Sequence, residues 1–440
     1  MLNLPGLVVE ATLDNTTQYE VEVTVEGGEP KCPCPFPKML LNGRKRTMFF
    51  DTPMHGKRVG IWVQRQRYRC KSCGRSHYQS VPHMHAKHDM TRRLVDYIQR
   101  FGTERTFTAI SSEIGVNVET VRRIWREHAR AELDRLDTVT PTWMGIDEIH
   151  IMHGYRGVIT NVKERTIVDL LKDRKKETVV RYLAGLPDAH VITHIAMDMW
   201  EPYRDAVRIA LPKATIVVDR FHVSRMASEA MERVRKLLGA TLPQKSKLML
   251  MGDRWLLLRN EKDLDATQTI LLQSTLGQFP LLRKAWEAKE GFRAIWKLPT
   301  RAEAEQAYTD WLTALDPDVV PAFGDLVRAM GNWRAEIFNY FEHRITNAYT
   351  ESFNSIARKM DRMGRGYSFE VLRAKLLLRY GCHKGEKPPA RFVRTGTSSN
   401  HLSMARTAGF MMAEPPPSPR HLGVDMGSLA VWLDSLPDTP

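Results

Sequence analysis

The chain has 440 residues, of which 42% are hydrophobic, and its formal net charge is +14. Its length predicts about three domains, its hydrophobic content excludes a chain that is disordered throughout, and the lack of any apolar run of about 18 residues excludes a membrane span. The basic excess favours a polyanionic partner, most commonly nucleic acid, over the alternative of a basic surface that only keeps the protein soluble.

The first region, residues 1–90, alternates short β-like runs with Pro, Gly and Cys. Its start lacks the basic and apolar segments of a secretory leader, which favours a cytoplasmic protein. Four of the five cysteines form two close pairs, and in such a protein close pairs bind metal more often than they form disulfides. We therefore expect a zinc ribbon in which four thiolates hold one structural Zn²⁺. These thiolates belong to Cys32, Cys34, Cys70 and Cys73.

Two alternatives to this zinc site stay open. The four cysteines can be reduced and unligated, or a histidine can replace one thiolate. The candidate histidines are His77, His83, His85 and His88. The pair Cys32 and Cys34 is separated by one residue instead of the usual two, so the geometry of the first half of the site is unusual.

Residues 91–138 are basic and helical, and the segment TFTAISSEIGVNVETVRRIWREHAR has the pattern of a helix-turn-helix. Gly115 occupies the expected sharp turn, and the second helix then presents polar and basic side chains to a DNA major groove. The residues expected to face DNA are Thr120, Arg122, Arg123 and Arg126. The alternative is an ordinary basic helical hairpin.

Residues 141–225 alternate strand and helix patterns in the order β-β-β-α-β-α-β-α, which is the chain order of the RNase H fold. We expect a multidomain α/β protein whose mixed-sheet core is interrupted by an all-α insertion over 226–340 and completed by 341–385. A flexible, Pro-rich tail is expected over 390–440. Five tryptophans of the insertion are expected to be mainly core residues, with stacking on an unpaired base as the alternative: Trp255, Trp286, Trp296, Trp311 and Trp333.

The chemistry is expected from three acidic residues that this order brings together. Asp147 lies within the apolar strand TWMGIDEIHI, where an unpaired carboxylate is costly to bury. Asp198 follows the fourth strand, and Glu351 lies on a later helix that begins near Asn347. Three carboxylates can hold two Mg²⁺ ions, or Mn²⁺ in their place, for phosphoryl transfer.

Two residues are candidates for the second acid, and the chain order of the elements favours Asp198. Asp219 follows the fifth strand and is the competing candidate. If Asp198 is the ligand, Asp219 and His222 form a supporting pair behind it, unless they are only a helix cap and a structural histidine. Glu148 and Glu342 are weaker candidates.

Four motifs together resemble the bacterial insertion-sequence transposases of the ISL-three family, a group of DDE transposases. They are GIDEIHI, AMDMWEPYRDAV, PKATIVVDRFHV and TNAYTESFNSIARKM. The resemblance extends over roughly residues 30–385, and the cysteine pairs and the helix-turn-helix match the family's front end. It implies an RNase H-like core with a helical insertion, a DDE triad dependent on Mg²⁺, binding to terminal inverted repeats, and cut-and-paste movement.

The expected function is therefore that of a transposase acting on double-stranded DNA, both the ends of a mobile element and its target. At least two copies are expected to assemble, since two ends must meet, and Arg358 and Arg362 are expected to face DNA. The rival functions are a DNA-binding regulator without strand-transfer activity, a nuclease that cuts without joining, and a zinc-ribbon protein that binds RNA.

Overall fold

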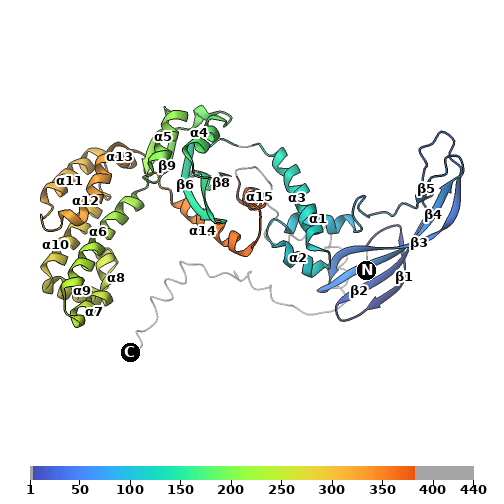
Figure 1. The fold of residues 1–440 in the computed structure, drawn as a ribbon, viewed down its shortest axis with the longest axis horizontal. Coiled ribbons are helices and arrows are strands. Elements are labelled where there is room, and N and C mark those ends of the chain that lie inside the picture. Colours follow the sequence, from blue (N-terminus) through green and yellow to red (C-terminus); the bar gives the residue numbers. More distant parts are fainter. Residues whose placement is uncertain (1–2, 138, 382–440) are drawn as a thin grey trace, which may run out of the picture. The chain divides into compact units, whose positions relative to one another are not determined.

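The structure is a computed structural model that describes residues 3–137 and 139–381. This part contains two mixed β-sheets and many α-helices (Figure 1). None of the described helices is long and apolar enough to cross a membrane. The tail expected over 390–440 lies outside the described residues, as does Cys382.

The first sheet has the strand order β1-β2-β4-β3, with β5 paired to β4. Its strands are β1 (Leu7–Asp14), β2 (Gln18–Val25), β3 (Met39–Met54), β4 (Lys57–Cys70) and β5 (Ser76–Tyr78). β2 runs parallel to β4, and the other pairs are antiparallel. The small core of this sheet includes Val21, Val23, Ile61 and Val63, which alternate along β2 and β4 and therefore share one face.

Three helices follow the first sheet, and the residues between them explain where α2 ends and α3 begins. They are α1 (Arg92–Phe101), α2 (Phe107–Ile114) and α3 (Val118–Arg135). Gly115 ends α2 with φ of 76°, a conformation that glycine adopts without strain. Asn117 then caps α3, because its side chain accepts a hydrogen bond from Glu119 N–H. The predicted helix, turn and helix are thus present.

The second sheet has the strand order β10-β9-β6-β7-β8. Its strands are β6 (Trp143–Ile151), β7 (Gly154–Asn161), β8 (Thr166–Leu170), β9 (His194–Met197) and β10 (Thr215–Val218). β6, β7 and β8 are antiparallel, whereas β9 and β10 run parallel to β6. The carboxyl ends of β6, β9 and β10 therefore point the same way.

Helices cover both faces of this sheet. α4 (Lys176–Ala184) and α5 (Glu201–Ala210) pack with Met144 and Ile146 on one face. α14 (Ala348–Met363) and α15 (Phe369–Tyr380) pack with Ile149 and Ile151 on the other. Because side chains alternate along a strand, Asp147 points to the face that α14 covers. A short 3₁₀ helix (Ala189–Val191) precedes β9.

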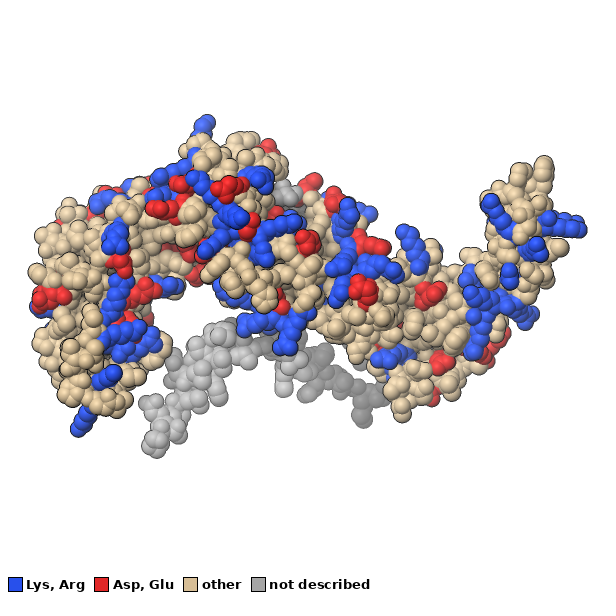
Figure 2. Space-filling model, in the orientation of Figure 1, with Lys and Arg blue, Asp and Glu red and all other residues tan. Residues whose placement is uncertain are grey.

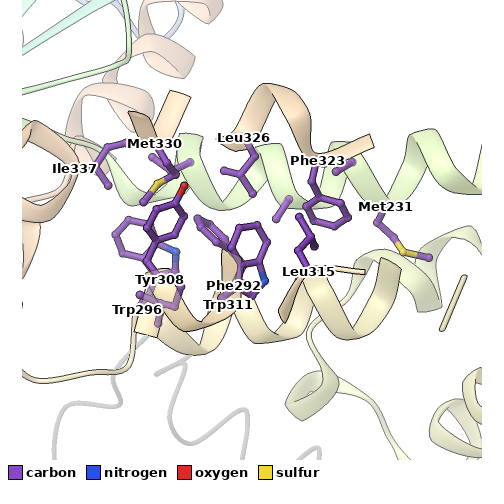
Figure 3. Packing of buried hydrophobic residues seen from close by; sticks show 14 of the residues in the cluster. Met231, Phe292, Trp296, Tyr308, Trp311, Leu315, Phe323, Leu326, Met330 and Ile337 are labelled. Carbon is purple, nitrogen blue, oxygen red and sulfur yellow. The ribbon is translucent and has the colours of Figure 1, made fainter. Parts of the chain in front are cut away.

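The chain between β10 and α14 is helical. Its helices are α6 (Arg220–Thr241), α7 (Gln244–Gly252), α8 (Arg254–Leu258), α9 (Ala266–Gln278), α10 (Pro280–Ile295), α11 (Arg301–Ala314), α12 (Val320–Asn332) and α13 (Arg334–His343), with a 3₁₀ turn at Glu261–Asp263. A large aromatic and aliphatic core joins them, with Phe292 between Trp296 and Trp311 (Figure 3). The expected insertion boundaries at 226 and 340 fall inside α6 and α13, so each of these helices runs from the sheet into the helical region.

The tryptophans of this region divide into two groups. Trp286, Trp296, Trp311 and Trp333 are buried, as expected for core residues. Trp255 is 66% exposed. The prediction that all five are mainly core residues is therefore wrong for Trp255, since it lies on the outer side of the short helix α8.

Candidate active site

Asp147 is the acid at the centre of the second sheet. It is buried, its Oδ1 accepts a hydrogen bond from Glu148 N–H at 2.7 Å, and its Oδ2 accepts one from the Asn354 side-chain amide at 2.7 Å. Burial, followed by repulsion from Asp198, raises the pKa of Asp147 from 3.8 to about 7. The carboxylate is thus held in one orientation, and none of the residues that the structure describes forms an ion pair with it.

Asp198 follows β9, the strand adjacent to β6. Its Oδ1 atom is buried and accepts no well-aligned hydrogen bond from the described residues, although His222 Nε2 lies 3.1 Å away. Burial, then the negative charges of Asp219 and Glu351, raise the pKa of Asp198 to about 7. A buried carboxylate oxygen without a hydrogen-bond partner is suited to binding a cation.

Glu351 reaches the same place from the first turn of α14. Its Oε1 atom lies 3.1 Å from His222 Nε2, the same nitrogen that approaches Asp198. Asp147, Asp198, Glu351 and His222 therefore converge, although they come from β6, the end of β9, α14 and α6. The spacing of the acids along the sequence gives no hint of this closeness; the topology does.

Asp219 has a different environment from the other acids. It is buried, and both of its carboxylate oxygens accept backbone hydrogen bonds: Oδ1 from Phe221 N–H at 3.0 Å and Oδ2 from Asn347 N–H at 2.8 Å. It therefore caps α6 and ties the start of α6 to the start of α14. The helix cap considered from the sequence is present, whereas His222 contacts two acids and is more than a packing residue.

α14 packs directly against β6 at Gly145, where there is no room for a side chain. A Cβ atom at Gly145 would lie 2.6 Å from Thr350 Oγ1 and 2.8 Å from Asn347 Oδ1. Thr350 is buried and pairs with Thr160 Oγ1 on β7 at 2.7 Å. This close approach positions Glu351 and Asn354 over the sheet.

Glu148 and Glu342, the weaker candidates for the second acid, each form an ion pair with an arginine. Glu148 forms an ion pair with Arg174 at 2.7 Å, and Glu342 forms one with Arg301 at 3.2 Å. Arg358 and Arg362 are exposed on α14.

Asn354 is the residue of the site to which the sequence analysis gives no role. Its position three residues after Glu351 on one helix was the signal that could have identified it.

The four predicted cysteines form a second cluster. It lies at the open end of the β3–β4 hairpin, where β3 begins and β4 ends. Their Sγ atoms all lie within 4.8 Å of one another. Backbone hydrogen bonds, that from Cys73 first, lower the pKa of Cys70 to about 6, whereas burial raises the pKa of Cys34 to about 12. One thiolate is thus formed easily, and a cation would help to ionise the others. The arrangement is compatible with a tetrahedral zinc site that needs no histidine.

The strands leading to this cluster are strongly basic. Between residues 31 and 88 the sequence has thirteen Lys and Arg and a single acid, Asp51. Asp51 is itself buried and pairs with Arg93. Figure 2 shows basic side chains, with few acidic ones near them, on the part of the first sheet that carries β3, β4 and β5. Arg46 pairs with Glu22 and Lys57 with Asp14, and the remaining cations leave this surface with an excess of positive charge.

The helix-turn-helix segment keeps its expected faces. Val121, Ile124 and Trp125 are buried, and Arg123 and Arg126 are exposed. Two further residues predicted to face DNA, Thr120 and Arg122, are partly exposed, and Arg122 pairs with Glu119 at 2.8 Å.

Comparisons with known proteins agree with the resemblance seen in the motifs. Residues 144–376, more than half of the chain, match the family of ISL3 DDE transposases, described as transposase. The chain is 24% identical over 324 residues to the transposase for insertion sequence element IS1001 of Bordetella parapertussis, covering 72% of this chain and 80% of that protein. It is 25% identical over 296 residues to the transposase for insertion sequence element IS1557 of Mycobacterium tuberculosis, covering 61% and 66%.

The matched residues begin on β6 and end on α15, so they include Asp147, Asp198, His222 and Glu351. The chain belongs to the ISL3 family of transposases, the ISL-three family indicated by its sequence motifs.

Proposed function

We propose that this protein cleaves the ends of an insertion sequence and joins the released 3′-hydroxyl groups to target DNA. The observation that carries the proposal is the convergence of Asp147, Asp198 and Glu351, two of them within 3.1 Å of one His222 nitrogen. The strand order of the second sheet supports an RNase H type of core, in which acids on neighbouring strands and a covering helix meet.

The three carboxylates are the proposed ligands of Mg²⁺. Hard oxygen donors suit this ion, and Asp198 Oδ1 has no hydrogen-bond partner among the described residues. Divalent cations would also relieve the burial and mutual repulsion that raise the pKa values of Asp147 and Asp198. When bound, two such ions supply charge neutralisation at the scissile phosphate and activation of the attacking oxygen.

The protein's own side chains set the geometry of this reaction. Asn354 fixes the orientation of Asp147. His222 Nε2 is hydrogen-bonded to Glu351 Oε1 at 3.1 Å and lies 3.1 Å from Asp198 Oδ1, so the imidazole keeps the two acids near each other. Water forms the new bond to phosphorus and the bond to the 3′ oxygen breaks, which leaves a 3′-hydroxyl. That hydroxyl then attacks a target phosphodiester in the same way, so one bond forms for each that breaks.

The DNA contacts are assigned to basic surfaces. The helix α3 offers Thr120, Arg122, Arg123 and Arg126 to base edges, while the ribbon of β3 and β4 and the exposed Arg358 and Arg362 meet phosphates. The cysteine cluster is proposed to hold a structural Zn²⁺ at the end of this ribbon. Two element ends require at least two copies of the chain.

The test is strand transfer with a pre-cut element end and Mg²⁺, comparing the parent with Asp147→Asn, Asp198→Asn, Asp219→Asn and Glu351→Gln. We expect no joined product from the Asp147, Asp198 and Glu351 variants, and Glu148→Gln serves as the control in the same part of the sheet. Unchanged joining by Asp147→Asn or Glu351→Gln would refute the triad. Binding without any cleavage by the parent would indicate a regulator, and nicks without joining would indicate a nuclease.

The same variants decide which aspartate is the second ligand. Asp219 accepts two backbone hydrogen bonds, so Asp219→Asn should lower the melting temperature but keep the increase produced by Mg²⁺. Asp198→Asn removes a repelled carboxylate, so it should keep or raise the melting temperature and lose the Mg²⁺ response. The opposite pattern would assign the metal to Asp219.

A further inference from the structure

A groove of about 900 Å³ leads from the acidic residues into the helical region. Asp219, Phe221 and Glu351 line its end near the acids, and Trp255, Lys262 and Lys297 line it further along. The groove is thus continuous with the proposed cleavage site, and its far part is built by α8 and the segments around α10.

Two aromatic side chains in this groove are exposed to an unusual degree. Trp255 is 66% exposed and Phe221 is 55% exposed, whereas the other tryptophans of the helical region are buried. A large exposed ring beside a cleft is a candidate contact for a flat apolar partner. Phe221 lies two residues after Asp219, so one ring is next to the acids and the other is on α8.

The helix that carries Trp255 is held rigidly, although it has only five residues. Its Leu257 is buried, and the fully buried Lys289 donates hydrogen bonds to Leu257 O at 2.9 Å and Arg259 O at 2.7 Å. Arg293 also donates to Leu258 O, at 3.3 Å. These cations satisfy the carbonyl groups at the end of α8, where the helix dipole favours positive charge. Trp255 is therefore presented on a fixed platform.

The groove also offers free cations. Lys262 and Lys297 are exposed and form no ion pair with any residue that the structure describes. Arg293 and Glu290, in contrast, pair with each other at 3.2 Å. Unpaired cations beside exposed rings are the features that single-stranded nucleic acid requires: the cations meet phosphates and the rings stack on bases.

We propose that this groove holds an unpaired stretch of the DNA strand next to the cleavage site, with a base stacked on Trp255 and phosphates beside Lys262 and Lys297. This inference rests on the proposed function and adds a subsite to it. A paired base cannot use such a ring, because both of its faces are already stacked in the duplex. The terminal base pairs must therefore open for the strand to enter the groove.

Binding of a single strand tests the subsite directly. The probe is a fluorescein-labelled twelve-nucleotide oligo(dT), and its affinity for the full chain is measured by anisotropy. We expect Trp255→Ala to weaken binding about tenfold, and Trp255→Phe to keep most of it. Ile270→Ala is the matched control, since Ile270 is 70% exposed on α9 and does not line the groove. Equal affinity for the parent and Trp255→Ala would overturn the proposal, as would an equal loss in Ile270→Ala.

Strand transfer gives the second measurement and separates the two proposals. On a fully paired element end, Trp255→Ala should join DNA at least tenfold more slowly than the parent. An end with a mismatch beside the cleavage site no longer needs opening, so it should restore part of the rate. No restoration would argue against the stacking role. If the parent joins no DNA but its oligo(dT) binding depends on Trp255, the proposed function fails and the subsite stands.

Discussion

Gly145 on β6 and Thr350 on α14 are in direct contact, and a Cβ atom at position 145 would lie only 2.6 Å from Thr350 Oγ1. The same Cβ would also press on the Thr160 hydroxyl and on Asn347 Oδ1. Gly145 lies two residues before Asp147 on β6, and Thr350 lies one residue before Glu351 on α14. The distance between Asp147 and Glu351 therefore depends on the absence of a Cβ atom at Gly145.

Gly145→Ala is expected to displace α14 from the sheet. Overpacking at a buried contact of this kind costs about 1–3 kcal/mol, so the melting temperature should fall, and joining should fall more than tenfold because Glu351 and Asn354 move with the helix. Gly154→Ala on β7 is the matched control, since its added Cβ would approach only the end of the Arg156 side chain, at 3.6 Å. Unchanged joining by Gly145→Ala would mean that the helix position does not set the geometry of the acids.

Asp147→Asn is expected to stabilise the metal-free protein at neutral pH. The pKa of Asp147 rises from 3.8 unfolded to about 7 folded, so the folded state retains its proton longer. Its contribution to stability is present below pH 4 and is lost as the pH rises through about 7. At about 1.4 kcal/mol per pKa unit, the variant should gain about 2–4 kcal/mol at pH 8 in denaturant unfolding with EDTA present.

The stabilisation of the protein by Mg²⁺ should increase with pH over the range in which Asp147 loses its proton. Protons compete with the metal for Asp147 and Asp198, so the stabilisation by Mg²⁺ should be larger at pH 8 than at pH 5.5 in the parent. Asp147→Asn should lose this stabilisation at both pH values. A metal response that is equal in parent and variant would show that Asp147 is not a ligand.

Cys70→Ser is expected to remove zinc from the front end of the protein. Cys70 has the thiol that ionises most readily among the three of the cluster whose pKa is shifted, and zinc binds thiolates. Elemental analysis of the purified chain should find about one zinc per chain in the parent and close to none in the variant. Cys382→Ser, which changes the one cysteine outside the two pairs, should leave the zinc content unchanged.

The buried Lys375 leads to a second expected pH dependence of the free energy of unfolding, at a site separate from the acidic residues. It is buried on α15 among the rings of Phe107, Trp125 and Tyr367, and donates hydrogen bonds to Gly102 O and Arg105 O. Burial lowers its pKa from 10.5 to about 7.

Because this pKa is lower in the folded state, the contribution of Lys375 to stability is present above about pH 10 and is lost as the pH falls through 7. The free energy of unfolding of the parent, measured relative to Lys375→Met, should rise by up to about 1.4 kcal/mol per pH unit between these values. A constant difference between parent and variant would contradict the assignment.

Local patterns explain why much of this architecture could be predicted. The strands that precede Asp198 and Asp219 are short apolar runs followed by helix signals, so the order of these elements could be predicted. The cysteine pairs predicted a cluster that the structure confirms, and Gly115 and Asn117 marked the turn between α2 and α3.

Long-range contacts explain what could not be predicted. The parallel pairing of β2 with β4 and the hydrogen bond from Asn354 to Asp147 join residues that no local pattern relates. Trp255 and Trp311 look alike in sequence, yet one is exposed and the other buried, because the packing of the surrounding helices decides which side of each helix faces the core.

The helices α6 to α13 lie in the sequence between the second sheet and α14, and this order has a consequence for protein synthesis. A ribosome delivers the strands with Asp147 and Asp198 well before α14 emerges, and domains generally begin to fold as they leave the ribosome. Until α14 docks at Gly145, Asp147 lacks Asn354 and the third carboxylate is missing. A nascent or prematurely terminated chain would therefore carry the basic front end without a complete set of acids, and so could occupy DNA without breaking it.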